Sequence, residues 1–360
     1  MRFVLSPALL LLALAHSASA EDLKLNQIQA IGSHNSYHVA PPEPLMKTLV
    51  KFNKDAEAWN YSHPPLAEQL EMGVRQFELD IHADPKGGLF AEPLAIKLAR
   101  FAGEKLPDFN ASGEYSKPGI KIMHVPDVDC WSTVPSLKGA LEQMRGWSDK
   151  HPQHLPVMVL LECKDQPEVK LPTKPEPFTR ERLLELDQEI LAAIPAERIL
   201  KPDDVRAGAK TLREAVLQKG WPTIDSLRGK FLFCLDNTDE IRSRYLESNP
   251  ALEGRVLFVT APSEEDPAAA WFKCNDPQAE QERIRKLVKA GFLVRTRSDT
   301  NKPDAKMKEA AFASGAQWVS TDHFIRGKAD SVTFDGDLFH SNPVSAEGVK
   351  KGEKSLENSH

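Results

Sequence analysis

The chain has 360 residues, a formal net charge of −6 at pH 7 and 41% apolar residues. This acidic balance gives no indication of nucleic-acid binding. Beyond the first residues, no segment offers the roughly 20 consecutive apolar residues of a membrane helix, so we expect a soluble mature protein.

The first 20 residues have the pattern of an export signal. Arg2 precedes the apolar stretch 8–15, and the small residues 18–20 resemble a cleavage site. We expect residues 1–20 to be removed and the protein to be exported, either to a periplasm or out of the cell. Residues 21–360 are expected to form one domain, because barrels of alternating strands and helices often exceed roughly 250 residues. No pattern indicates an oligomeric state.

Eight short apolar runs predict strands, and the amphipathic segments between them predict helices. The strands are expected at 27–31, 74–81, 120–125, 157–162, 230–236, 255–260, 292–297 and 318–321. Helical periodicity is clearest at 134–149, 180–193 and 278–290. This alternation predicts an α/β fold, and eight strands favour a closed (β/α)8 TIM barrel, with a doubly wound sheet as the alternative.

Two proline-containing segments, 90–117 and 165–177, interrupt the alternation after predicted strands. In a barrel, segments at that position shape the mouth of the active site, so they are either substrate-contacting loops or surface insertions without function. The four cysteines allow three pairings, between which the sequence does not choose, and two of them lie in apolar strands where a buried thiol is expected. They are Cys130, Cys163, Cys234 and Cys274.

Polar residues accompany the first two predicted strands. The first strand ends in IGSHNSY, which places His34 and Asn35 where barrel enzymes keep catalytic groups. The second contains FELDIH, in which Glu78 and Asp80 are two residues apart and point to the same face. Burying two carboxylates together costs several kcal/mol unless a cation compensates, so the pair predicts either a metal site or a salt bridge to arginine or lysine.

The next two predicted strands also end in polar groups, His124 and Glu162. Each alone could be structural, His124 as a hydrogen-bonded core histidine and Glu162 as a carboxylate that caps a loop. Because four successive strands share this feature, we favour a common active site.

The predicted ligand set offers only oxygen atoms, which suits calcium or magnesium rather than zinc. It consists of Asn35, Glu78, Asp80 and Glu162. Two histidines with an ordinary pKa of about 6.5 can donate a proton and stabilise charge at neutral pH. Together these groups fit in-line displacement at phosphorus, in which the metal neutralises oxygens and one histidine protonates the leaving alkoxide.

These residues resemble the calcium-dependent phosphatidylinositol-specific phospholipases C, especially their compact secreted bacterial branch. The resemblance rests on GSHNSY at 32–37, RQFELDIH at 75–82, KIMHV at 121–125 and VMVLLECKD at 157–165, with weaker support from VRTRSDT at 294–300 and WVSTDHF at 318–324. It implies a PLC-like phosphodiesterase barrel that acts on a phospholipid at a membrane surface, bound transiently. The segment between Asp80 and His124 is long for this pattern, which leaves the head-group preference open.

The resemblance also implies roles for single residues. His34 would stabilise the pentacoordinate phosphorus, and His124 would protonate the diacylglycerol oxygen as it leaves. Calcium, favoured over magnesium, would be held by the four oxygen ligands and would activate the inositol 2-hydroxyl, so that a cyclic phosphate forms. Three basic residues are similar to those that bind phosphate or head-group oxygens in the family: Lys164, Arg295 and Arg297.

Two alternatives remain at this point. Glycerophosphodiester phosphodiesterases and phospholipase D-like barrels share the His, Glu-x-Asp, His plan, but they typically have Arg-Gly after the first histidine, where this chain has Asn35. A secreted barrel that binds inositol lipids without turnover is the non-enzymatic alternative. The pair His34 and His124 argues against it, because a binding protein needs no proton-transfer groups.

Overall fold

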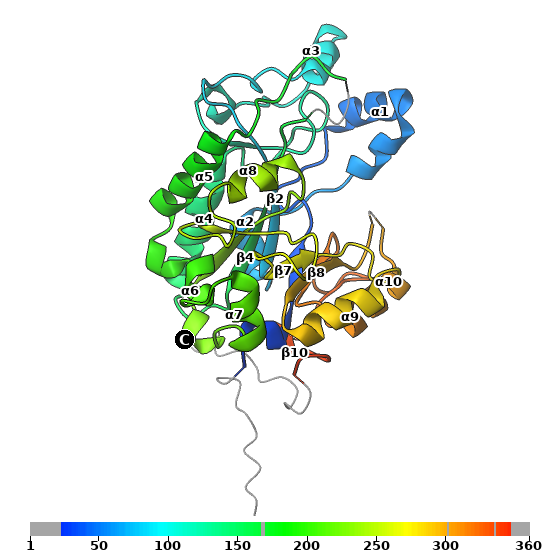
Figure 1. Cartoon of the computed structure of the whole chain (residues 1–360). Coiled ribbons are helices and arrows are strands. Elements are labelled where there is room, and N and C mark those ends of the chain that lie inside the picture. Colours follow the sequence, from blue (N-terminus) through cyan, green and yellow to red (C-terminus); the bar gives the residue numbers. More distant parts are fainter. Residues whose placement is uncertain (1–22, 167–169, 301, 335, 347–360) are drawn as a thin grey trace, which may run out of the picture.

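The fold is a parallel β-barrel surrounded by helices, seen in a computed structural model that describes residues 23–166, 170–300, 302–334 and 336–346 (Figure 1). Eight strands follow one another in the order β6-β5-β4-β2-β1-β9-β8-β7. Their bounds are β1 Ile28–Ser33, β2 Gln76–His82, β4 Val157–Cys163, β5 Phe231–Leu235, β6 Leu257–Val259, β7 Trp271–Lys273, β8 Leu293–Arg297 and β9 Trp318–Thr321. The predicted α/β class and TIM-barrel architecture are confirmed.

The barrel is nearly closed at the junction of β6 and β7. These strands share no ladder, but an isolated parallel bridge joins Thr260 to Trp271, and the amide of Ala261 donates to the carbonyl of Trp271 at 3.1 Å. Closure matters because unpaired backbone groups at a sheet edge would otherwise invite pairing with another chain.

The predicted strand at 120–125 is not a barrel strand. The structure forms only β3 (Lys121–Ile122) there, and β3 pairs antiparallel with the end of β2. The eighth strand of the barrel is instead β7, which was not predicted. The apolar side chains at 120–125 pack into two different hydrophobic clusters: Ile122 lies in the main core and Met123 in a second cluster.

Ten α-helices lie in the described ranges. Their bounds are α1 Glu43–Phe52, α2 Leu66–Glu71, α3 Leu94–Phe101, α4 Leu137–Lys150, α5 Arg180–Ala193, α6 Pro202–Arg206, α7 Leu212–Gln218, α8 Glu240–Leu246, α9 Gln281–Ala290 and α10 Ala305–Ser314. Side-chain caps fix several starts: Ser136 accepts from the amide of Gly139 before α4, and Thr179 accepts from that of Arg182 before α5. The periodicity at 180–193 predicts α5 with its observed bounds. None of these helices is both long and apolar enough to cross a membrane.

The long segment 90–117 forms α3 and packs into a second hydrophobic cluster with the start of α1, around Leu45, Phe90 and Tyr115. Because α1 follows β1 and α3 follows β2, this cluster sits at the carboxyl end of the barrel, at the top of Figure 1. The short strand β10 (Phe339–Ser341) pairs antiparallel with the beginning of β1 and therefore marks the opposite end. All four cysteines are buried free thiols. The predicted export signal and part of the segment 165–177 lie outside the described residues.

Candidate functional site

The polar groups gather at the carboxyl ends of five neighbouring strands, in the order β4-β2-β1-β9-β8. His34 and Asn35 follow β1, Glu78 and Asp80 lie in β2, Glu162 lies in β4 and is followed closely by Lys164, and Arg295 and Arg297 lie in β8. Asp80 and Glu162 are Cα partners in the parallel register of β2 and β4, so their side chains leave the sheet on the same face.

His34 is held by groups from three other segments. Its Nδ1 lies 3.2 Å from Oδ1 of Asp322, which follows β9, and its Nε2 lies 3.3 Å from Nη1 of Arg297. His63 contacts the carbonyl oxygen of His34 at 3.0 Å and Asp322 at 3.4 Å. Burial alone would raise the pKa of Asp322, but His34, His63 and Arg297 hold that pKa well below its usual range. Asp322 is therefore an ionised partner that orients the His34 ring.

The loop after β1 is hydrogen-bonded to β2. Asn35 has a positive φ of 41°, a conformation that asparagine tolerates better than most residues. The amide of Ser36 donates to the carbonyl of Glu78 at 2.9 Å, and Ser36 Oγ accepts from the amide of Glu78 at 2.8 Å. Nδ2 of Asn35 donates to the Tyr61 hydroxyl at 3.1 Å, which turns the amide oxygen of Asn35 away from that contact.

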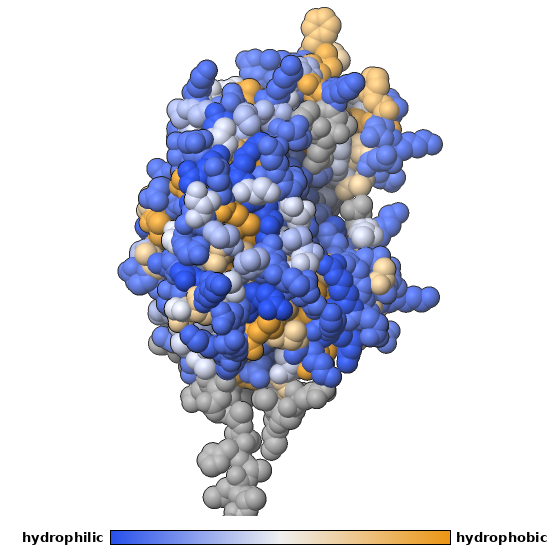
Figure 2. All heavy atoms as spheres, in the orientation of Figure 1, coloured by the Kyte–Doolittle hydropathy of each residue, from blue (hydrophilic) through white to orange (hydrophobic). Residues whose placement is uncertain are grey.

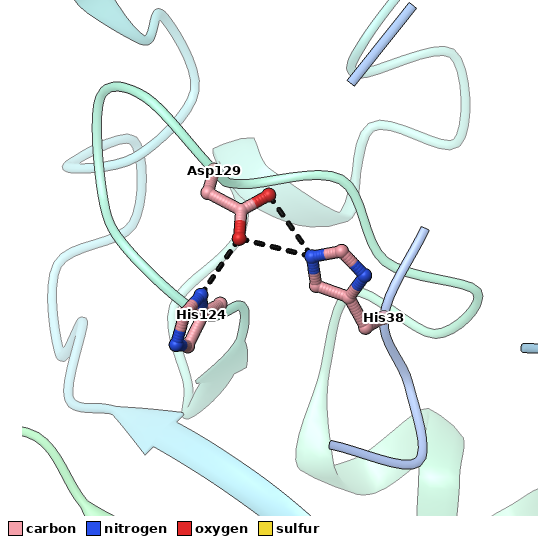
Figure 3. A group of neighbouring side chains, drawn as sticks. All are labelled: His38, His124 and Asp129. Carbon is pink, nitrogen blue, oxygen red and sulfur yellow. Dashed lines mark hydrogen bonds and ion pairs between the residues drawn. The ribbon is translucent and has the colours of Figure 1, made fainter. Parts of the chain in front are cut away.

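His124 lies in a loop after β3 and is backed by a second buried carboxylate (Figure 3). Its Nδ1 is 2.7 Å from Oδ2 of Asp129, and its side chain is 20% exposed. His38 contacts both oxygens of the same carboxylate at 2.9 and 3.0 Å. Burial raises the pKa of Asp129, but the contacts with His124 and His38 outweigh burial and lower it. Each of the two predicted catalytic histidines thus has an ionised carboxylate behind its Nδ1 atom.

The predicted carboxylates are matched with basic side chains. Glu78 forms a buried ion pair with Arg295, which also donates to Ser320 at 3.0 Å. Nζ of Lys164 lies 3.4 Å from Asp80 and 3.1 Å from Glu162. Burial raises the pKa of Glu78, but the positive charges of Arg295, His34 and Arg297 outweigh it. The predicted salt-bridge alternative for Glu78 and Asp80 is thus present in the structure.

Asp80 is a buried carboxylate whose negative charge its neighbours do not fully neutralise. Burial raises its pKa to about 7, and although Lys164 opposes this rise, the charge of Glu162 adds to it. Its Oδ1 atom is buried and forms no hydrogen bond of ordinary geometry with the described residues. His124 lowers the pKa of Asp80 through its charge. The His124 loop therefore lies near this end of the barrel. A hard divalent cation fits these oxygen donors, because it would satisfy the orphaned oxygen and offset the clustered negative charge.

One spacing in the structure suits a different class of metal. Among the described residues, a group of three possible ligand atoms within 4.8 Å of one another consists of His38, His124 and Asp129. Among the described residues, Glu78, Asp80 and Glu162 form no such group, and Glu78 binds Arg295.

Four functional side chains were not predicted: His38, Asp129, Asp236 and Asp322. Asp236 directly follows β5, forms a buried ion pair with Lys273 of β7, and has its pKa raised to about 6, first by burial. Asp236 and Asp322 could have been found, because Asp236 is the last residue of a predicted strand, as Glu162 is, and Asp322 directly follows another. Asp129 gives no such signal, since it lies in a loop whose fold the sequence pattern does not reveal.

A protein-family model described as "Phosphoinositide phospholipase C, Ca2+-dependent" matches residues 23–343. Among solved structures, a calcium-dependent phosphoinositol-specific phospholipase C from Pseudomonas sp. matches with a TM-score of 0.55 and 16% identity, over 86% of this chain and 94% of that one. A Ca2+-dependent phosphatidylinositol-specific phospholipase C from Streptomyces antibioticus matches with a TM-score of 0.55 and 18% identity, over 83% and 95%. These likenesses show the fold. No curated protein matches the chain significantly.

Proposed function

The chain belongs to the Ca2+-dependent phosphoinositide phospholipase C family and is a calcium-dependent enzyme of that kind, and we propose that it releases diacylglycerol from phosphatidylinositol by two-histidine catalysis. The water-soluble product is an inositol phosphate that forms as a cyclic diester, through attack of the inositol 2-hydroxyl on phosphorus. The observation that carries this proposal is the pairing of each histidine with its own buried carboxylate, Asp322 for His34 and Asp129 for His124.

His124 is the general acid of the proposal. Nδ1 of His124 faces Asp129, and Nε2 points away from that carboxylate in Figure 3. The proposal assigns Nε2 to deliver a proton to the leaving glycerol oxygen. The Asp129 carboxylate behind the ring fixes its orientation. In this proposal His34, oriented by Asp322, faces the equatorial oxygens of the reacting phosphate, and the guanidinium of Arg297 beside it supplies positive charge there.

Asn35, Glu78, Asp80 and Glu162 are the proposed calcium ligands. When bound, calcium would supply positive charge to the phosphate and lower the pKa of the attacking hydroxyl. The basic residues divide by their burial. Arg295 is 0% exposed and holds Glu78, whereas Arg297 and Lys164 have side chains that are 13% and 14% exposed and can meet substrate oxygens.

A membrane surface is the proposed site of this reaction, and α1 and α3 form the face that meets it. Three of the four exposed large apolar side chains in the described ranges are here: Phe52 at 88%, Leu98 at 58% and Phe101 at 93%. Both helices stand at the carboxyl end of the barrel, where the site lies, and Figure 2 shows apolar atoms protruding there.

The charges beside these apolar side chains suit an anionic lipid. An exposed basic residue precedes each phenylalanine, Lys51 before Phe52 and Arg100 before Phe101. Inserting one phenylalanine side chain into lipid contributes about 1.5–3 kcal/mol, so the two together can hold the enzyme transiently on a bilayer. We expect Phe52→Ser with Phe101→Ser to lower turnover of vesicle-borne phosphatidylinositol at least ~10-fold.

A soluble short-chain substrate and a matched variant test this surface. The double variant should cleave short-chain phosphatidylinositol at the wild-type rate, because the site itself is intact. Leu217 provides the control: it is 39% exposed in α7, and α7 is followed by Lys219, whose carbonyl binds Lys24 just before the start of β1, at the opposite end of the barrel. If Leu217→Ser weakens vesicle turnover as much as the double variant does, the α1 and α3 surface has no special part in lipid binding.

Assaying purified protein against phosphatidylinositol and glycerophosphodiesters, with calcium and with a chelator, tests the proposal against its alternatives. We expect calcium-dependent cleavage of the phosphoinositide. Preferred hydrolysis of glycerophosphodiesters would favour a glycerophosphodiester phosphodiesterase or phospholipase D-like activity. Binding of the lipid without turnover would favour an inositol-lipid binder.

A further inference from the structure

His38 is a third buried histidine at the site, and neither the proposed chemistry nor the family resemblance gives it a role. It lies four residues after His34 in the loop that follows β1, and it is 0% exposed. Its ring stacks on Tyr61, with centroids 4.2 Å apart and planes at 19°. Fully burying a histidine costs free energy unless both ring nitrogens find partners.

Both ring nitrogens of His38 face acceptors. Nδ1 lies 3.0 Å from the carbonyl oxygen of Tyr61, and Nε2 lies within 3.0 Å of both Asp129 oxygens. A carbonyl cannot donate a hydrogen bond, and neither can an ionised carboxylate. Each ring nitrogen of His38 therefore has an oxygen partner, and Asp129 is contacted through both of its carboxylate oxygens.

This contact joins two loops that carry different catalytic groups. His124 and Asp129 belong to the same short loop, which is closed on itself by mutual backbone bonds of 2.9 Å between Val125 and Asp129. Within that loop, Asp129 could turn about its own side-chain torsions. His38 comes from the segment that also carries His34, so it fixes the Asp129 carboxylate from outside the loop (Figure 3).

We infer that His38 is a positioning residue for general-acid catalysis: it clamps Asp129, and Asp129 in turn holds the His124 ring with its Nε2 toward the leaving oxygen. This inference rests on the proposed role of His124 as the acid. The direct hydrogen bonds favour a relay over a metal centre at these three residues. A transition metal would have to sit among them at about 2.0–2.2 Å from each ligand atom, in place of the contacts of 2.7–3.0 Å that the structure shows.

Two soluble substrates with different leaving groups separate positioning of the acid from general damage. Short-chain phosphatidylinositol expels an alkoxide, which needs a proton, whereas the p-nitrophenyl ester of inositol phosphate expels a phenolate, which leaves without one. A misplaced acid therefore slows the first reaction and spares the second.

His38→Phe keeps a flat ring against Tyr61 and removes the contacts of both ring nitrogens. We expect kcat for the short-chain lipid to fall about 10- to 100-fold and kcat for the p-nitrophenyl ester to change less than about 3-fold. His38→Gln restores one donor toward Asp129 and should recover part of the lost rate. His154, which is equally buried but bonded to Ser148, is the matched control, and His154→Gln should leave the ratio of the two rates unchanged.

His124→Ala distinguishes failure of this inference from failure of the proposed function. If His124→Ala slows both substrates equally, His124 is not the general acid. If His124→Ala is selective for the lipid but His38→Phe and His38→Gln are not, the positioning role of His38 is wrong. Circular dichroism of each variant reports folding, and should His38→Phe not fold, the comparison of His38→Gln with wild type decides the question.

Discussion

Replacing Asp322 by asparagine removes the negative charge behind His34 and keeps the shape of the side chain. Asp322 is nearly fully buried, with a side chain 3% exposed, and lies 3.2 Å from Nδ1 of His34. At an effective dielectric constant of about 20, two unit charges at that separation attract by about 5 kcal/mol, which is an upper bound on what the variant loses. Since each ~1.36 kcal/mol of barrier is tenfold in rate, the bound corresponds to about 10⁴-fold.

We therefore expect Asp322→Asn to lower kcat by about 10²- to 10⁴-fold, with little change in KM, because the lost charge acts on His34 in the transition state. The assay is initial-rate turnover of short-chain phosphatidylinositol at saturating calcium, which avoids any effect of membrane binding. Calcium affinity, measured by calorimetry, should stay near the wild-type value because Asp322 is not among the proposed ligands.

A partly buried ion pair between α8 and the segment that follows β6 supplies the control for this variant. Asp266 binds Arg242 at 2.7 Å and contacts no residue of the site. Asp266→Asn should lower stability without lowering kcat of the folded enzyme. If Asp322→Asn retains more than a tenth of the wild-type kcat, the charge behind His34 contributes too little for the proposed mechanism.

Other predictions follow from individual groups. His34→Ala and His124→Ala should each lower kcat for phosphatidylinositol by about 10²- to 10⁴-fold while calorimetry still detects calcium binding; unchanged turnover in either variant removes that histidine from the mechanism. Asp80→Asn should weaken calcium binding, whereas Asp187→Asn, another buried carboxylate, should not. Burial lowers the pKa of His154 to about 4, so the folded state resists a proton that the unfolded state accepts below about 6.5. Stability should therefore fall by up to ~3 kcal/mol as the pH drops from about 6.5 to 4, and His154→Gln should flatten that slope in denaturant titrations.

The main architecture is predictable because the strands that carry the site are regular. The apolar runs around 157–162 and 318–321 are long enough, and well enough bounded, to predict β4 and β9 within a residue or two. The run WFK of β7 is too short for periodicity to stand out. Residues 120–125 mislead for a different reason, because their apolar side chains divide between two cores rather than line one face of a strand.

The partners of the site residues are harder to predict than the residues themselves. Glu78 and Asp80 stand out in the sequence because they are charged residues within an apolar strand. Nothing in the sequence indicates that Arg295, more than 200 positions later, neutralises Glu78. Asp129 and His38 lie in separate loops, and their side chains come into contact only in the tertiary fold. Asp322 could have been predicted by searching the carboxyl end of every predicted strand for an acidic residue.

The most direct test of the central claim is ³¹P NMR of phosphatidylinositol vesicles incubated with the purified mature protein. With calcium, the lipid signal should give way to that of a cyclic inositol phosphate, and neither a chelator-treated sample nor His124→Ala should produce that signal at a comparable rate. Cleavage that persists without calcium, or a phosphatidic acid signal in place of the inositol phosphate, would contradict a calcium-dependent, two-histidine phospholipase C.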